Sequence, residues 1–268
     1  FWSALAVATL VKGPIAALGV GTTVLGLAGK ARGFGWLRAL RPGRGGLDVA
    51  CGGGVLSGGA RARVGPRGSV TGLDPGRGML AVAAELDPEV RWQAGWAEEL
   101  PFEDAVFDRV VSQFGLMFFR EPARALREML RVVEPEGRVT LAVWDAIEQL
   151  PAYAASAAIL DELAGAEAAD CVRAPFALGD AARVRGLIEE AGGRVVAQET
   201  PVGEARFPSV RSMMEADLRG WLPLLGVTLD EALIERILVE AEARLAALVT
   251  PSGELVFETS AHLFTLQR

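Results

Sequence analysis

Histidine and cysteine are scarce in this chain of 268 residues, which contains one histidine, His262, and two cysteines, Cys51 and Cys171. A single histidine nearly excludes a metal site built from several histidines, and it removes the usual general base from most of the molecule. Two cysteines cannot form a disulfide framework, and they fit a reducing compartment best. We therefore expect a cytoplasmic protein without a metal site.

Basic residues are also in short supply, with 27 lysines and arginines against 34 acidic residues and a net charge of −7. A protein that binds nucleic acid through its phosphates normally has a basic excess, so nucleic acid is not an expected partner. Hydrophobic residues make up 51% of the chain and charged residues 23%, which is ordinary for a globular protein. The length suggests one large domain, or a core with a smaller insertion.

The chain lacks a long uninterrupted apolar run. An uncharged stretch lies between Lys12 and Lys30, but it contains Pro14 and five glycines. A membrane-spanning helix needs roughly 20 consecutive apolar residues, which is more than this stretch offers. We expect no membrane span, and we expect residues 1–44 to form an N-terminal helical segment that packs on the body of the protein.

From Gly45 onward, short apolar runs alternate with helical patterns. The expected strands are Gly46–Ala50, Ser69–Leu73, Val90–Ala94, Phe107–Gln113 and Gly137–Trp144. Helical patterns cover Gly78–Leu86 and Pro122–Val133, and a weaker one runs to Val64. Strands that alternate with helices imply crossover units and a mostly parallel sheet. The expected fold class is α/β: a doubly wound, Rossmann-like sheet with helices on both faces.

Beyond Trp144 the alternation is looser. The pattern predicts helices over Pro151–Ala164, Asp180–Ala191, Ser209–Leu225 and Leu229–Val249, one strand within Arg194–Phe207, and a final antiparallel strand over Gly253–Leu266. We therefore expect a Rossmann-like core over residues 45–207, a helical cap insertion over 208–250, and the last strand of the core sheet within 251–268.

The most informative segment runs from Leu47 to Leu56 and reads L-D-V-A-C-G-G-G-V-L. A strand that ends in a glycine cluster and opens a helix brings a ligand close to bare backbone. Asp74 follows Gly54 by 20 residues, at the end of the second expected strand. A carboxylate in that place can accept hydrogen bonds from both hydroxyls of a ribose. Together these features indicate a nucleoside-binding site.

Four motifs resemble the class I S-adenosylmethionine-dependent methyltransferases, especially those similar to the quinone-biosynthesis methyltransferases. They read D-V-A-C-G-G-G at 48–54, V-T-G-L-D-P-G-R-G-M-L at 70–80, A-E-E-L-P-F-E-D-A-V-F-D at 97–108 and S-Q-F-G-L-M-F-F at 112–119. The resemblance is close over about residues 45–145 and looser over the later helices and the final strand. It implies methyl transfer from S-adenosyl-L-methionine to a small, apolar or aromatic molecule.

The resemblance also implies roles for particular residues. The first motif would line the methionine part of the cofactor, with Asp48 organising the loop, and Asp74 would bind the ribose diol. Residues after the second and third expected strands would lie near the adenine, although Met79 fits a core position equally well. The residues at the tip of the fourth strand would face the sulfonium and the substrate. The implied cofactor-binding residues are Asp48, Ala50, Cys51, Gly52, Gly54, Asp74, Pro75, Met79, Trp96, Ala97, Gln113 and Phe114.

Three departures from the family pattern concern the same region. Ala50 replaces the first glycine of the first motif, and Gly58 and Gly59 lie in the helix that follows it. Trp96 stands where the family commonly has an aspartate that accepts a hydrogen bond from the adenine amino group. An indole cannot accept that bond, so Trp96 would either stack on the purine or fill its pocket.

No residue is assigned a catalytic role from the sequence. His262 lies in an apolar strand and is expected to be a packed histidine rather than a base. Asp145, Glu148 and Tyr153 are better placed for substrate contact, although Asp145 could equally cap the segment after it. The sequence leaves open whether carbon, oxygen or nitrogen is methylated, and it leaves open a homodimer.

Two other functions are compatible with a glycine loop followed by an acidic residue. The alternative is a non-catalytic S-adenosylmethionine-binding protein on the same fold. Trp96 favours it, and so does the N-terminal stretch, which lacks the polar and aromatic residues with which relatives often close the cofactor site. A nicotinamide-dependent reductase is disfavoured, because Ser57 stands where the dinucleotide-binding pattern G-x-G-x-x-G requires its third glycine.

Overall fold

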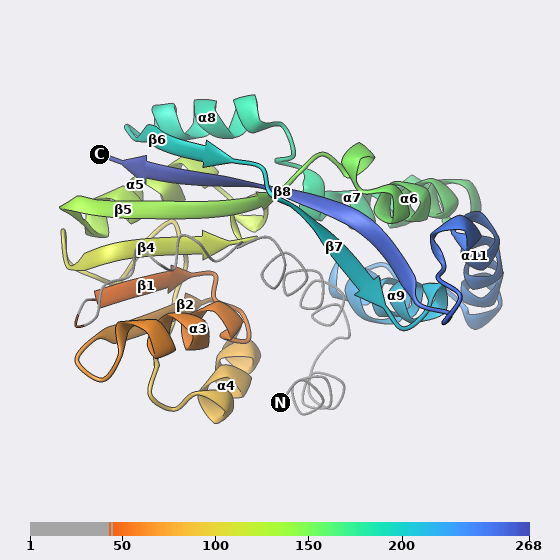
Figure 1. Ribbon diagram of the computed structural model, residues 1–268, viewed down its shortest axis with the longest axis horizontal. Helices are drawn as coiled ribbons and strands as arrows, with labels where there is room; N and C mark the ends of the chain where they lie inside the picture. Colours follow the sequence, from red (N-terminus) through yellow and green to blue (C-terminus); the bar gives the residue numbers. More distant parts are fainter. Residues whose placement is uncertain (1–42, 44) are drawn as a thin grey trace. The chain divides into compact units, whose positions relative to one another are not determined.

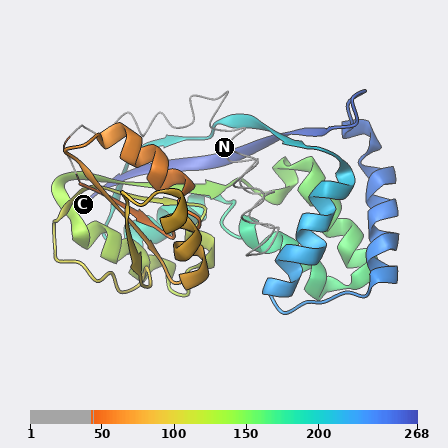
Figure 2. The same cartoon turned by 90° about the horizontal axis from the view of Figure 1, so that it is seen from below.

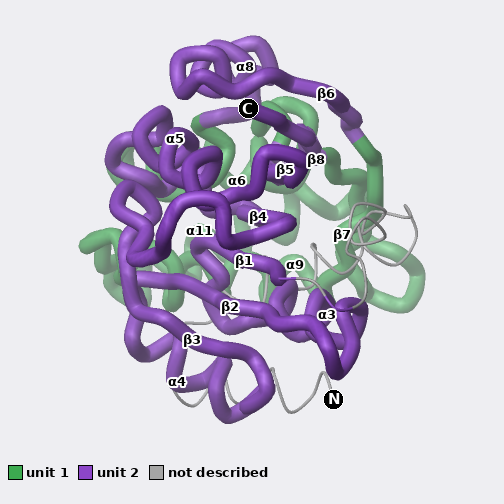
Figure 3. Tube along the Cα trace, turned by 90° about the vertical axis from the view of Figure 1, so that its left-hand side faces the viewer, with its two compact units in different colours: residues 1–33, 145–177, 201–260 green, residues 34–144, 178–200, 261–268 purple. Residues whose placement is uncertain are grey.

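The computed structural model describes Gly43 and residues 45–268. These residues form two compact units, coloured separately in Figure 3. Unit 1 contains residues 145–177 and 201–260, and unit 2 contains the described residues up to 144 together with 178–200 and 261–268. The helical segment expected over residues 1–44 lies, apart from Gly43, outside the described residues.

Unit 2 contains a twisted sheet whose strands lie side by side in the order β3-β2-β1-β4-β5-β8-β6 (Figure 1). The strands are β1 (Gly45–Val49), β2 (Ser69–Asp74), β3 (Arg91–Ala94), β4 (Phe107–Gln113), β5 (Val133–Trp144), β6 (Arg194–Glu199) and β8 (Leu255–Gln267). Only residues 261–267 of β8 belong to unit 2. The first five strands pair parallel with one another, whereas β8 runs antiparallel to both β5 and β6. This confirms the predicted α/β fold with its final antiparallel strand.

Helices cover both faces of this sheet. On one face α3 (Val55–Val64) packs against Val70 of β2 and Val111 of β4 in a small buried cluster. On the other face α5 (Pro122–Val132) and α8 (Ala181–Glu190) pack in the main core with β1 and β5. Figure 2 shows α3, in orange, and α5, in green, on opposite sides of the strands. A fourth helix, α4 (Arg77–Leu86), follows β2.

The fifth strand begins four residues earlier than the sequence pattern predicts, at Val133 rather than Gly137. Val133 pairs with Phe107, and the pairing shifts register before it resumes between Arg109 and Arg138. Gly137 lies at this irregularity, where a Cβ would approach the Asp108 carbonyl oxygen to 2.8 Å. The extra residues form a bulge, which alternation of apolar residues does not predict.

Unit 1 is built from helices and one strand pair. The helices are α6 (Pro151–Ala164), α7 (Ala166–Arg173), α9 (Val210–Ala216), a π-helical turn η5 (Asp217–Trp221), α10 (Leu222–Leu224) and α11 (Glu231–Arg244). Strand β7 (Val202–Phe207) pairs antiparallel with residues 255–260 of β8. No helix among residues 45–268 is long and apolar enough to cross a membrane.

The structure differs from the sequence-based expectations at three places in the second half of the chain. The single strand expected within Arg194–Phe207 is two strands, β6 and β7, separated at Thr200 and Pro201. The helix α7 was not predicted, and it groups with α6 and the later helices in unit 1. The helix expected over Ser209–Leu225 contains the π turn.

Candidate functional site

The twelve residues expected at the cofactor site all belong to unit 2, at or just beyond the carboxyl ends of four neighbouring strands. Asp48 is in β1, and the glycine loop follows that strand. Asp74 ends β2, Trp96 follows β3, and Gln113 ends β4. The carboxyl edge of a parallel sheet is where open α/β folds bind ligands. The fold therefore brings the expected residues to one edge.

The loop between β1 and α3 turns through backbone angles that favour glycine. The φ angles are +60° at Ala50, +52° at Gly52 and +80° at Gly54. The loop is tied to the next strand, because the Cys51 N–H donates to the Leu73 carbonyl oxygen at 3.1 Å. Ala50 therefore has a left-handed backbone conformation, which costs about 1 kcal/mol for an alanine. The glycine of the family pattern would adopt the same conformation without strain.

Asp74 joins two loops through its carboxylate. Its Oδ2 accepts a hydrogen bond from the Gly52 N–H at 3.0 Å, and its Oδ1 accepts one from the Gly76 N–H at 2.7 Å. A carboxylate oxygen can accept two hydrogen bonds, so each oxygen keeps one free position. Asp74 is half-buried and can therefore also accept bonds from a ligand.

Asp48 lies beneath the loop and is almost completely buried, at 1% exposure. Its Oδ2 accepts a 2.6 Å hydrogen bond from the Ser57 hydroxyl at the start of α3. Burial raises the pKa of Asp48 to about 7; the bond from Ser57 opposes this rise, and the nearby charge of Asp74 adds to it. Asp48 therefore organises the loop from below by holding the first turn of α3 against β1.

Trp92 of β3 supports the glycine loop, and sequence reasoning missed it. A Cβ at Gly54 would lie 2.4 Å from Cη2 of Trp92, and a Cβ at Gly72 would lie 2.4 Å from its Cζ3. The indole Nε1–H donates to the Asp87 carbonyl oxygen at 3.0 Å, which fixes the ring. The available signal was Gly72, a glycine inside a buried strand whose neighbour across the sheet is this tryptophan.

Two further expected residues are Met79, which lies beside the loop, and Cys51, which is part of it. Met79 is half-buried, and its Cε would lie 3.7 Å from a Cβ at Gly52. Cys51 is buried, and burial raises the pKa of its thiol well above the usual range, so the thiol is unreactive. Pro75 is exposed at the start of the loop after β2.

Trp96 is 49% exposed, so the described residues do not enclose its indole. The Arg120 guanidinium lies 4.3 Å from the centre of the ring. Glu98 also contacts this segment, because its Oε1 accepts a hydrogen bond from the backbone N–H of Arg120 at 2.7 Å. Ala97, by contrast, is buried.

The end of β4 is the second strained point of the site. Gln113 is half-buried, and Phe114 has a φ angle of +55°. The Phe114 ring stacks on Trp144 with centroids 4.0 Å apart and planes 10° apart. A Cβ at Gly115 would approach the Cβ of Ala50 to 2.6 Å, so this glycine lets the β4 loop pack against the β1 loop. Strained residues of this kind are typical of binding sites.

Both ring nitrogens of His262 take part in hydrogen bonds within unit 2. Nε2 is 3.0 Å from the Gly179 carbonyl oxygen and must donate to it, because a carbonyl only accepts. Nδ1 then accepts from the Thr200 hydroxyl at 2.8 Å. This geometry fits a packed histidine rather than a general base.

The residues expected to contact substrate lie in unit 1, where both carboxylate oxygens of Asp145 accept hydrogen bonds from nearby residues of the same unit. Its Oδ1 accepts from the Ala146 N–H at 2.8 Å, and its Oδ2 accepts from the Ser260 hydroxyl at 2.7 Å. Tyr153 packs among aromatic rings, and Glu148 is exposed. Among the described residues, no group of three or more histidine, cysteine, aspartate or glutamate side chains could hold a metal ion.

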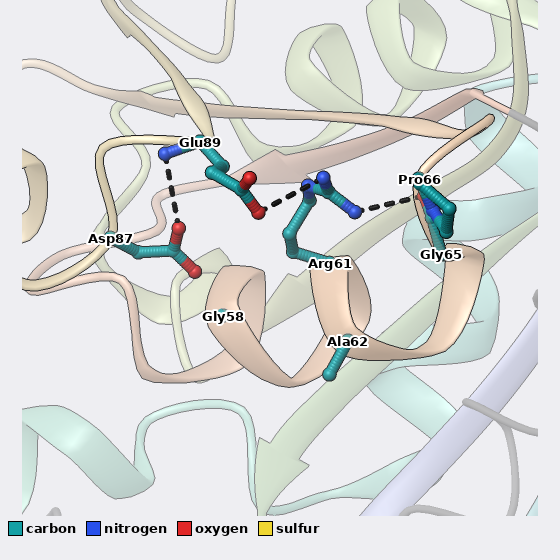
Figure 4. A pocket seen from close by; sticks show the side chains of 7 residues that line it. All are labelled: Gly58, Arg61, Ala62, Gly65, Pro66, Asp87 and Glu89. Carbon is teal, nitrogen blue, oxygen red and sulfur yellow. Dashed lines mark hydrogen bonds and ion pairs between the residues drawn. The ribbon is translucent and has the colours of Figure 1, made fainter.

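A separate pocket lies beside α3 and contains none of the twelve expected residues (Figure 4). Arg61 lies within it and is held by Glu89 at 3.0 Å and by the Gly65 carbonyl oxygen at 2.8 Å. Gly58 faces Asp87 there, with 3.4 Å between Oδ2 and the position of a Cβ. Gly58, a residue that is unfavourable inside a helix, thus allows the turn at Asp87 to pack closely against α3.

The chain is similar in sequence and in fold to known methyltransferases. Residues 47–141 match the family described as a methyltransferase domain. A demethylmenaquinone methyltransferase from Bacillus cytotoxicus is 42% identical over 105 residues, which are 37% of this chain and 44% of that protein. One from Renibacterium salmoninarum is 44% identical over 101 residues, which are 38% of this chain and 41% of that protein. The chain thus matches less than half the length of these relatives.

The solved structures resemble this chain in fold. The YcgJ protein from Bacillus subtilis has a TM-score of 0.56 and 17% identity, over 87% of this chain and 96% of that one. At this identity the likeness shows the fold alone. The expected family is confirmed for the matched segment, which runs from β1 into β5 and includes the glycine loop and Asp74.

Proposed function

Because residues 47–141 belong to the methyltransferase domain family, we propose that this protein transfers a methyl group from S-adenosyl-L-methionine to a small apolar or aromatic molecule. The observation that carries the proposal is the carboxylate of Asp74 at the end of β2, bonded to the N–H of Gly52 in the glycine loop. This arrangement supports the proposal, because it brings a carboxylate beside bare backbone, as a site for a ribose requires.

The described residues leave the glycine loop open at Gly52 and Gly53, which supports the proposed cofactor. Among the described residues, a Cβ at Gly52 or at Gly53 would meet a single atom within 4 Å, the Cε of Met79. Met79 is unbranched and half-buried, so its end can shift when a ligand enters. Trp92 therefore packs closely against the loop at Gly54, whereas only the movable end of Met79 lies near Gly52 and Gly53.

The residues at this edge take the roles that their positions suggest. Those of the first motif line the methionine part of the cofactor, and Asp74 accepts the ribose hydroxyls. Residues after β2 and β3 lie beside the adenine, and the two at the end of β4 lie beside the sulfonium. The proposed binding residues are Asp48, Ala50, Cys51, Gly52, Gly54, Asp74, Pro75, Met79, Trp96, Ala97, Gln113 and Phe114.

The protein's part in the reaction is mainly positioning. S-adenosylmethionine supplies an activated methyl group with a good leaving group, and an in-line displacement transfers it. The protein must align the acceptor with the methyl group and exclude water, and such positioning can lower a barrier by about 7–11 kcal/mol. The glycine loop, held by Asp48 and Asp74, and the stacked ring of Phe114 supply fixed surfaces for this purpose.

The acceptor that the relatives suggest is a demethylmenaquinone-type molecule. The two relatives compared above are named for methylation of demethylmenaquinone, and their similarity to this chain is confined to about 100 residues. Such a molecule is aromatic and apolar, as the proposed function requires. A homodimer and the absence of a nucleic acid partner stay predictions from the sequence.

The alternative of a non-catalytic binding protein rested on Trp96 as a residue that fills the adenine pocket. The indole is half exposed and has Arg120 against its ring, which supports a surface beside the purine rather than a plug. Stacking of this kind contributes on the order of 1 kcal/mol. The proposal of an enzyme is therefore preferred.

The proposed cofactor is tested by calorimetric titration of the purified protein with S-adenosylhomocysteine and, separately, with NAD⁺ and NADP⁺. We expect saturable one-to-one binding of S-adenosylhomocysteine and no binding of either nicotinamide nucleotide. Binding of a nicotinamide nucleotide without binding of S-adenosylhomocysteine would overturn the proposal and favour a reductase.

A further inference from the structure

A buried carboxylate in unit 1 has no role in the site described above. Although other atoms of Asp217 reach the surface, its Oδ2 is buried and has no hydrogen-bond partner among the described residues. Buried polar atoms without a partner are rare, because each loses its hydration without compensation. An ionisable group left in this state calls for an explanation by a ligand or by a functional constraint.

The backbone at Asp217 is as unusual as its side chain. Asp217 opens the π-helical turn η5, in which the Leu222 N–H donates to the Asp217 carbonyl oxygen five residues earlier. Such turns are rare and frequently lie at functional sites. The turn is anchored to α7, because the Trp221 Nε1–H donates to the Cys171 carbonyl oxygen at 2.7 Å. This geometry holds Asp217 in a fixed place.

Apolar residues before and after Asp217 in the chain are buried. Met214, Leu218 and Leu222, which precede and follow it along α9, η5 and α10, are buried in the core of unit 1. Burial alone raises the pKa of Asp217 to about 7, with no charged group among the causes.

The neighbouring charged groups are occupied elsewhere. Arg219, two residues further along the turn, pairs with Glu231 and Glu215. Arg211 of α9 pairs with Glu235 and Glu242. On α7, Arg173 pairs with Asp170 and Asp161. None of these cations forms an ion pair with Asp217, so the described residues supply no counter-charge to it.

We propose that Asp217 is the acceptor of a binding site in unit 1 for a hydroxyl group on an apolar molecule. The ligand supplies the hydrogen-bond donor that Oδ2 lacks. A hydroxyl fits better than an ammonium group, because removing a charged group from water into apolar surroundings costs far more than removing a neutral one. The inference goes beyond the proposed function and does not depend on it.

The test compares two probes that differ by one hydroxyl group, 1-naphthol and naphthalene. Saturation-transfer NMR titrations with the full chain should show at least tenfold tighter binding of 1-naphthol, as expected for a hydrogen bond to an ionisable acceptor. An apolar pocket without such an acceptor would bind naphthalene at least as well. In Asp217→Leu the preference should vanish, and in Asp217→Asn it should fall to about threefold or less, since an amide is a weaker acceptor.

The matched control is Glu215→Gln, which removes a carboxylate one turn or less away that pairs with Arg219. It should keep the full preference for 1-naphthol. Equal preference in the wild type and in Asp217→Leu would overturn the proposal, and so would a failure of the wild type to bind either probe. If 1-naphthylmethylamine bound more tightly than 1-naphthol, the site would prefer a cation to a hydroxyl group. That result would contradict the proposal.

A second readout separates a ligand site from a structural role. Because folding raises the pKa of Asp217 from 3.8 to about 7, the native state binds a proton that the unfolded state lacks between these pH values. The contribution of Asp217 to stability therefore falls as pH rises through that window. Asp217→Leu should raise the melting temperature, and more at pH 8 than at pH 5. A lowered melting temperature at both pH values would show that Asp217 stabilises the fold, and would overturn the proposal.

The same proteins distinguish this inference from the proposed cofactor. Asp217→Leu should bind S-adenosylhomocysteine as the wild type does, since no proposed cofactor residue is altered. If the wild type failed to bind S-adenosylhomocysteine but still preferred 1-naphthol through Asp217, the proposed function would fail and the site in unit 1 would stand. The reverse result would remove this site and leave the cofactor proposal intact.

Discussion

Replacing Asp74 by alanine is expected to weaken binding of S-adenosylhomocysteine by about 10- to 1,000-fold while leaving the fold intact. Two hydrogen bonds from ribose hydroxyls to a carboxylate, at roughly 1.5–3 kcal/mol each before water compensates for part of the loss, give this range. The structure adds a second cause, because Asp74 also accepts from the N–H groups of Gly52 and Gly76. Alanine would therefore remove both the ribose acceptor and the tie between two loops.

The matched control for this change is Asp108→Ala. Asp108 likewise uses a carboxylate oxygen to accept from a backbone N–H, that of Gly45 at 2.8 Å, but at the amino end of β1 rather than at the carboxyl edge. Its removal should lower stability without changing affinity for S-adenosylhomocysteine. If titration calorimetry gave the same affinity for Asp74→Ala as for the wild type, the ribose contact would have to be made elsewhere.

Replacing Gly54 by alanine is expected to lower the free energy of unfolding by about 3 kcal/mol. The φ angle of +80° is unfavourable for alanine by about 1–2 kcal/mol. The new Cβ would also lie 2.4 Å from the ring of Trp92, and overpacking of this kind costs about 1–3 kcal/mol. Denaturant unfolding measures the sum, and weakened binding of S-adenosylhomocysteine should accompany it because the loop must shift.

Two further glycines separate these causes. Gly65 has a φ angle of +69° and no atom within 4 Å of its Cβ position, so Gly65→Ala adds strain without a clash and should cost about 1 kcal/mol. Gly72 has no positive φ, but its Cβ would lie 2.4 Å from Trp92, so Gly72→Ala adds the clash alone and should cost about 2 kcal/mol. Equal losses for Gly54→Ala and Gly65→Ala would show that Trp92 does not constrain the loop.

The strands from β1 to β4 could be predicted from the sequence because turn residues bound each of them. Phe107–Gln113 is the strand that the pattern predicted, β2 and β3 differ from the prediction by one residue at one end, and β1 differs by one residue at each end. The bulge before Gly137 could not be predicted, since it depends on how β5 pairs with a strand distant in the sequence. The division of Arg194–Phe207 into β6 and β7 has the same cause, because the two strands pair with different parts of β8.

The candidate site could also be predicted in part: its location follows from the sequence, whereas the contacts that support it do not. The order of strands and the rule that ligands bind at their carboxyl ends bring Asp74 and the glycine loop to one edge. The contact of Trp92 with Gly54 is between side chain and backbone on different elements, and no periodic pattern reveals it. The lack of a partner for the Asp217 oxygen among the described residues likewise depends on the three-dimensional positions of donors distant in the sequence.

The central claim is that the edge formed by the glycine loop and Asp74 supports methyl transfer. Its most direct test is to incubate the protein with S-adenosylmethionine carrying a labelled methyl group and with demethylmenaquinone, oxidised or reduced, and to measure label in the extracted lipid. We expect label in the extract from the wild type, a large loss in Asp74→Ala, and full transfer in Asp108→Ala. A wild-type protein that binds S-adenosylhomocysteine yet transfers no label to demethylmenaquinone in either form would contradict the proposed activity on this class of acceptor.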